Sequence, residues 1–155
     1  MSGQGAGLGS IRVVSEVRIE APPERVWRAL TEETNAWWPK GFFARPESTR
    51  MVFEPRVGGR QYEDCANGEG VLWGVVYGIK APHSLQLAGD LFPEFGGPAR
   101  LLTTYTLKAD GVGTALRLVD CAFGVIGEKL QESLESGWKT ILQDSLKPYV
   151  EGKKA

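Results

Sequence analysis

The chain has 155 residues, a formal net charge of −1, a hydrophobic fraction of 42% and two cysteines. This length fits a single domain, and the hydrophobic fraction excludes a wholly disordered chain. The near-zero net charge excludes an overall basic field that would recruit nucleic acid or an anionic membrane.

The N-terminal residues 1–10 are rich in glycine and serine, and we expect them to form a flexible arm. They lack the basic and apolar regions of a signal peptide, and no apolar run in the chain approaches the roughly 20 residues that span a bilayer. The sequence therefore predicts a cytoplasmic protein without membrane insertion. A single domain over residues 11–150 and a short tail over 151–155 complete the expected organisation.

The first strand is predicted from Ile11 to Ile19, where apolar and polar residues alternate with a period of two. Pro22 and Pro23 end this strand and open a helix, because proline suits the first helical turn. A second short helix is expected to end before Pro39.

Six further strands are predicted at about 50–54, 60–66, 70–80, 84–91, 100–108 and 113–123. Turn sequences such as Asn67-Gly68 and Asp110-Gly111 separate them. Short connections between successive strands favour antiparallel pairing. In the segment 70–80, one face of the strand is expected to carry the bulky residues Val71, Trp73, Val75, Tyr77 and Ile79.

The last segment, residues 127–150, changes to spacings of three and four between its apolar residues. This pattern predicts one long amphipathic helix, whose last turn Pro148 should kink or fray. The order of elements indicates an α+β fold, in which a curved antiparallel seven-stranded sheet wraps around the long helix.

Three motifs carry a resemblance to a known family. The stretch from Ala21 to Thr31 resembles the opening helix of the helix-grip superfamily, which includes the birch-pollen allergen, START-like lipid-transfer domains and polyketide cyclases. The segment from Phe53 to Arg60, with Trp73-Gly74 and the late Gly137-Trp138, is similar to homologues of the activator of the heat-shock-protein ATPase. The resemblance covers about residues 11–150.

The resemblance implies a cavity between the sheet and the long helix that takes an apolar or amphipathic small molecule, such as a lipid. It also implies a possible role as a stress-related chaperone accessory protein. The eukaryotic activators carry an additional N-terminal domain that grips the chaperone, which the ten glycine-rich residues at the start of this sequence cannot supply.

Alternation along the strands indicates which side chains face this cavity. Thr103, Tyr105, Thr114 and Asp120 share faces with leucines, where an unpaired polar group costs about 1–3 kcal/mol unless a partner satisfies it. The residues predicted to line the cavity and bind the ligand are Trp73, Tyr77, Leu87, Tyr105, Leu118, Asp120, Leu134 and Trp138.

Aromatic residues also gather in the predicted loops: Trp37, Trp38, Phe42, Phe43, Phe92 and Phe95. Loops beside a cavity between sheet and helix can form its mouth, whereas a homodimer interface would bury the same side chains. Both interpretations remain open at this point.

Catalysis would need a general acid or base, and the only candidates are Asp120, Glu63 and Tyr105. They would serve a cyclase, dehydratase or hydrolase that uses the same cavity. The single His83 and the two separated cysteines give no metal-ligand spacing, and no cofactor motif is visible. We therefore expect a binding module, with the enzyme and the chaperone accessory as alternatives.

Overall fold

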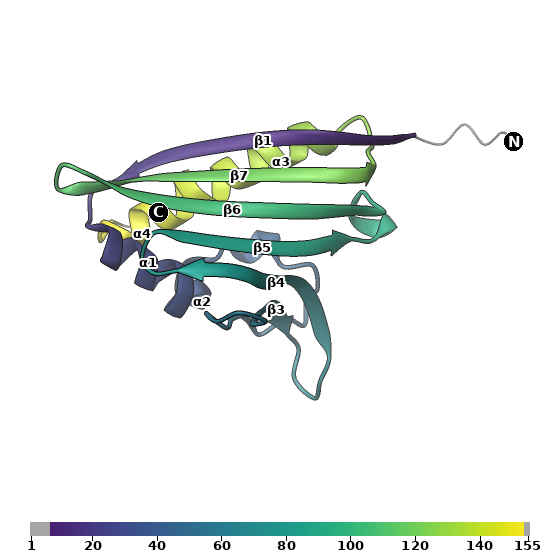
Figure 1. Cartoon of the computed structure of the whole chain (residues 1–155). Coiled ribbons are helices and arrows are strands. Elements are labelled where there is room, and N and C mark those ends of the chain that lie inside the picture. Colours follow the sequence, from purple (N-terminus) through teal and green to yellow (C-terminus); the bar gives the residue numbers. More distant parts are fainter. Residues whose placement is uncertain (1–6, 154–155) are drawn as a thin grey trace, which may run out of the picture.

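Seven strands form one antiparallel sheet in the order β1-β7-β6-β5-β4-β3-β2 in the computed structural model, which describes residues 7–153 (Figure 1). This confirms the predicted fold class. The strands are β1 (Leu8–Ile19), β2 (Arg50–Phe53), β3 (Arg60–Asp64), β4 (Gly70–Lys80), β5 (Ser84–Leu91), β6 (Ala99–Asp110) and β7 (Gly113–Val125).

Strand β1 begins earlier than the alternating pattern indicated. Leu8 pairs with Val125 and Ser10 pairs with Phe123, so residues 8–10 of the predicted arm belong to the sheet. Pairing with β7 supplies these residues with backbone hydrogen bonds, which their composition alone does not reveal. Residues 1–6 of the predicted arm and residues 154–155 of the predicted tail lie outside the described residues.

Two short helices, α1 (Pro23–Glu32) and α2 (Thr34–Trp37), follow β1 as predicted. Pro23 occupies the first helical position, where its missing N–H leaves no bond unmade. The indole N–H of Trp37 donates a hydrogen bond of 2.7 Å to the carbonyl oxygen of Ala29 and holds α2 against α1. Two 3-10 turns, η1 (Lys40–Phe42) and η2 (Pro93–Phe95), lie in the loops.

The C-terminal helix runs along one face of the sheet (Figure 1). It consists of α3 (Leu130–Lys139), a π-helical stretch η3 (Thr140–Leu146) and α4 (Lys147–Val150). Pro148 lies in the first turn of α4, directly after the π-helical stretch, where its missing N–H costs little. The kink or fraying expected at Pro148 stays a prediction. Leu142 and Leu146 are fully buried in the core.

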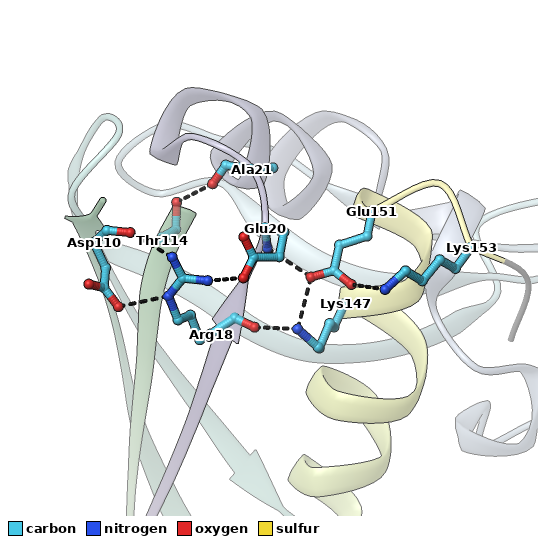
Figure 2. A network of polar contacts seen from close by, with 8 residues as sticks. All are labelled: Arg18, Glu20, Ala21, Asp110, Thr114, Lys147, Glu151 and Lys153. Atoms are coloured by element: carbon cyan, nitrogen blue, oxygen red, sulfur yellow. Dashed lines mark hydrogen bonds and ion pairs between the residues drawn. The ribbon is translucent and has the colours of Figure 1, made fainter. Parts of the chain in front are cut away.

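A network of polar contacts fixes the C-terminal end of this helix to β1 (Figure 2). The Lys147 ammonium donates hydrogen bonds of 2.5 Å to the Arg18 carbonyl oxygen and 2.8 Å to the Glu151 carboxylate. The same carboxylate accepts a hydrogen bond of 2.8 Å from the backbone N–H of Glu20. The helix is therefore anchored at its end, and α3 is left to border the site described below.

Strand β4 is irregular in two places, and this changes which side chains point inward. Its pairing with β3 passes from Leu72 to Gly74, and its pairing with β5 passes from Val76 to Gly78. Each shift adds one residue and reverses the alternation beyond it. Because of the first shift, Val76 is buried, whereas Tyr77 is 64% exposed, which corrects the predicted face of this strand.

Candidate functional site

A cavity of about 340 Å³ lies between the sheet and the C-terminal helix. Its wall is almost entirely apolar, with contributions from β3 to β7, from the helix, and from the segment that follows α2. The lining residues are Trp38, Phe42, Gln61, Trp73, Gly74, Leu87, Ala88, Gly89, Leu91, Phe95, Leu101, Thr103, Asp120, Leu130, Ser133, Leu134, Gly137, Trp138 and Ile141.

The principal charged group in this wall is the carboxylate of Asp120, on β7. Its side chain is fully buried, and each oxygen has one protein donor. Thr103 Oγ1 on β6 donates to Oδ1 at 2.8 Å, and Trp138 Nε1 on α3 donates to Oδ2 at 2.8 Å. Asp120 therefore joins two strands and the helix at one point of the cavity wall.

Burial raises the pKa of Asp120, because the apolar surroundings disfavour the charged carboxylate. The hydrogen bonds from Trp138 and Thr103 act in the opposite direction without cancelling this effect. Burial also raises the pKa of Tyr105, and the nearby charge of Asp120 adds to the shift. The wall thus contains a carboxyl group that holds its proton to higher pH than an ordinary aspartate.

Glu63, the second acid candidate, is fully buried but does not line the cavity. It lies beneath the loop that follows η1, where it accepts hydrogen bonds from the Ala44 backbone at 2.7 Å and from Ser48 Oγ at 2.6 Å. It also accepts the indole N–H of Trp73 at 2.7 Å. Because Trp73 lines the cavity, Glu63 acts as a positioning residue for this ring.

Five of the eight side chains predicted to line the cavity do so: Trp73, Leu87, Asp120, Leu134 and Trp138. The other three do not. Tyr77 points to the opposite side of the sheet, because the first irregularity of β4 reverses the alternation before this residue. Tyr105 and Leu118 are buried in the core instead, where they pair across β6 and β7.

Of the six aromatic residues predicted to form the mouth of the cavity, three line it and three do not. Trp38, Phe42 and Phe95 line the cavity, and the Phe95 ring packs against Trp73 with a centroid separation of 5.0 Å. Trp37 belongs to the core because its indole bonds back to α1. Phe43 is half-buried outside the lining, and Phe92 is 66% exposed beside a second, more polar hollow.

Sequence reasoning missed the polar Gln61 and most of the small and aliphatic wall residues, including Leu91, Leu101 and Ile141. Gly89, another of the lining residues, could have been found from the sequence. A Cβ on Gly89 would lie 2.0 Å from the carbonyl oxygen of Trp73, so only glycine allows β5 to approach β4 this closely. A glycine inside a strand is the expected mark of such an approach.

Within residues 7–153, no cluster of three or more histidine, cysteine, aspartate or glutamate side chains could hold a metal ion. No described helix has the length and apolar character needed to cross a membrane. The side chains of the cavity offer a large apolar surface, the buried Asp120 group and the amide of Gln61.

The antiparallel sheet wrapped along one long C-terminal helix, with two short helices after the first strand, defines a helix-grip protein. The sequence profile of the family described as "Activator of Hsp90 ATPase homolog 1-like protein" matches residues 20–151, and the chain belongs to this family. This confirms the resemblance found in the sequence.

Solved structures share the fold. Protein MLL2253 from Mesorhizobium loti is 24% identical with a TM-score of 0.69, and the alignment covers 94% of this chain and 100% of that one. The AHSA1-like protein from Aeromonas hydrophila is 22% identical, with a TM-score of 0.65 and coverage of 92% and 93%. CalU16 from Micromonospora echinospora is 19% identical, with a TM-score of 0.65 and coverage of 98% and 88%. No curated protein matches the chain.

Proposed function

We propose that this protein is a binding module that holds an apolar or amphipathic small molecule in the cavity between its sheet and its C-terminal helix. The observation that carries the proposal is the composition of the wall, which combines a continuous apolar surface with one buried polar group at Asp120. Concave apolar sites with a few convergent polar groups are typical of small-molecule binding.

Membership of the family is consistent with this proposal, and the cavity volume of about 340 Å³ lies at the lower end of the range of ligand sites. A single small ligand, rather than a large lipid, suits this volume. Association with a chaperone, homodimer formation and a cytoplasmic location stay predictions.

The test is native mass spectrometry of freshly purified protein, combined with extraction of whatever is released on unfolding. We expect a discrete adduct that disappears when the protein unfolds. Titration with the amphipathic dye 8-anilinonaphthalene-1-sulfonate then measures the affinity of the emptied cavity. An unliganded mass together with no dye binding would contradict the proposal.

A second candidate function is acid–base catalysis on the same ligand. It depends on Asp120, because Glu63 and Tyr105 do not line the cavity. The raised pKa of Asp120 suits a general acid, although its two oxygens already accept hydrogen bonds from Thr103 and Trp138. Chemical conversion of the extracted ligand by wild-type protein, lost in Asp120→Asn, would favour this candidate.

A further inference from the structure

The inner wall of the cavity separates it from a small void deeper in the protein. Three residues line both spaces: Trp38, Gln61 and Leu87. The void has a volume of only about 10 Å³, at the lower limit for one water molecule. Beyond it lie core side chains that include Leu30, Phe53, Leu85 and Tyr105.

The Trp38 indole is the largest of the three side chains between the cavity and the void. Its hydrogen bonding differs from that of Trp37, Trp73 and Trp138. The indole N–H groups of Trp37, Trp73 and Trp138 each donate a hydrogen bond of 2.7 to 2.8 Å within the protein. The Trp38 N–H is buried, and it has no partner among the described residues.

A buried N–H without a partner makes this orientation of the side chain less stable, because the group has lost its hydrogen bonds to water without gaining a protein acceptor. No hydrogen bond of the indole N–H therefore holds the Trp38 ring in its place between the cavity and the void. The ring is also only half-buried and stands directly after α2, where it packs on Trp37 at a centroid separation of 5.7 Å.

The residues around Trp38 favour a ligand that carries a hydrogen-bond acceptor. Turning the Trp38 ring would free its N–H to donate to an oxygen of the ligand. The Gln61 amide lines the same place and makes no side-chain hydrogen bond within residues 7–153. The Thr34 hydroxyl at the void already donates to the Leu30 carbonyl oxygen. Apart from it and the Tyr105 hydroxyl, the remaining side chains that line the void are largely apolar, so the rest of the ligand is expected to be apolar.

We propose that Trp38 is the residue that determines ligand length, as a movable divide that turns to admit an elongated apolar molecule bearing a hydrogen-bond acceptor at its inner end. A carbonyl or ether oxygen meets this requirement. This inference rests on the proposed function, since it specifies the ligand class of the same cavity.

The test uses straight-chain 2-alkanones of increasing length, which compete with 8-anilinonaphthalene-1-sulfonate for the cavity. In Trp38→Ala, which lacks the indole ring between the two spaces, we expect the affinity for long ketones to rise about tenfold relative to short ones, or about 1.4 kcal/mol. Trp27→Phe is the matched control, because Trp27 packs against the core and lines neither space.

The acceptor is tested with 2-methyl-1-alkenes, in which a methylene group replaces the carbonyl oxygen at nearly the same shape. Wild-type protein should prefer a long ketone to its alkene, and Trp38→Phe should lose most of this preference. In ¹⁵N-labelled wild-type protein, the indole N–H resonance of Trp38 should move on addition of a long ketone, while that of Trp27 stays in place. This measurement does not depend on how the variants fold.

The possible results separate the two proposals. If short ketones displace the dye but neither chain length nor the Trp38 resonance responds, the inference is overturned and the binding function stands. If no ketone displaces the dye from any form of the protein, the proposed function itself fails.

Discussion

The indole N–H of Trp138 donates a hydrogen bond of 2.8 Å to Asp120 Oδ2 and ties helix α3 to strand β7 at the cavity wall. The other carboxylate oxygen accepts from Thr103, so both acceptors of this buried side chain are used. The carboxyl group of Asp120 thus links α3 to both β6 and β7.

The first prediction concerns replacement of that group. Asp120→Leu leaves the buried Trp138 N–H without an acceptor and should lower the free energy of unfolding by about 1–3 kcal/mol or more. Asp120→Asn is the matched control. Its amide oxygen can still accept from Trp138 while its NH₂ donates to the Thr103 hydroxyl.

Chemical denaturation measures both variants. A loss in Asp120→Asn as large as that in Asp120→Leu would mean that the charge, rather than the hydrogen bonds, secures α3. Equal stability of all three proteins would show that the link between α3 and β7 is dispensable.

The second prediction follows from the raised pKa of Asp120. A carboxyl group whose pKa is higher in the folded state binds more protons there than in the unfolded chain. The contribution of Asp120 to the free energy of unfolding should therefore fall as pH rises from the ordinary value of 3.8 up to the raised pKa of the folded state.

Asp120→Asn cannot ionise and should lack this fall. The measurement is the difference in free energy of unfolding between the two proteins across this range of pH. A difference that is constant with pH, or that moves in favour of the wild type as pH rises, would contradict a raised pKa.

Much of the fold could be predicted because it depends on local patterns. The period of two located the first strand, turn sequences separated the six others, and spacings of three and four located the long helix. The irregularities of β4 could not be predicted in this way, since they arise where β4 must pair with both β3 and β5. The misplacement of Tyr77 follows directly from them.

The site was predicted less well for a different reason. Alternation assigns a residue to a face of the sheet but does not say where along the strand the packed core ends and the cavity begins. Thr103 and Tyr105 share one face of β6, yet Thr103 lines the cavity and Tyr105 packs edge-on against Trp138 with centroids 6.1 Å apart.

Leu118 illustrates the same limit. It pairs with Tyr105 across the sheet, two residues from Asp120, and is completely buried in the core. A substitution there tests packing rather than ligand recognition.

The third prediction concerns Gly137, which lines the cavity from α3. A Cβ at this position would lie 3.5 Å from the ring of Phe42, an ordinary contact distance. Gly137→Ala should therefore gain up to about 1 kcal/mol of stability from helix propensity and keep its affinity for 8-anilinonaphthalene-1-sulfonate.

Gly137→Leu adds branched carbons that must enter the cavity or displace Phe42, and overpacking of this kind costs about 1–3 kcal/mol. We expect about tenfold weaker dye binding, with the folded state retained. Fluorescence titration compares the two variants. Undiminished binding in Gly137→Leu would place the dye outside the cavity.

The fourth prediction concerns the anchor of the helix at Glu151, whose carboxylate is almost fully buried (Figure 2). Burial alone would raise the pKa of Glu151, but hydrogen bonds from Lys147 and Lys153 outweigh it, and the pKa lies below the ordinary 4.5. Since the folded state holds this proton less tightly, the ionised group stabilises the protein above pH 4.5 and loses its effect as pH falls through the lowered pKa.

Glu151→Gln should therefore cost about 1–2 kcal/mol at neutral pH, and the cost should shrink on acidification. The trend is opposite to that of Asp120, because the two carboxyl groups are shifted in opposite directions. Glu16→Gln is the control, since Glu16 is exposed and lies 3.9 Å from Arg117, where an ion pair contributes about 0–1 kcal/mol. Thermal unfolding at several pH values measures all three proteins, and equal losses in both variants at neutral pH would remove Glu151 from its role as the anchor of the helix.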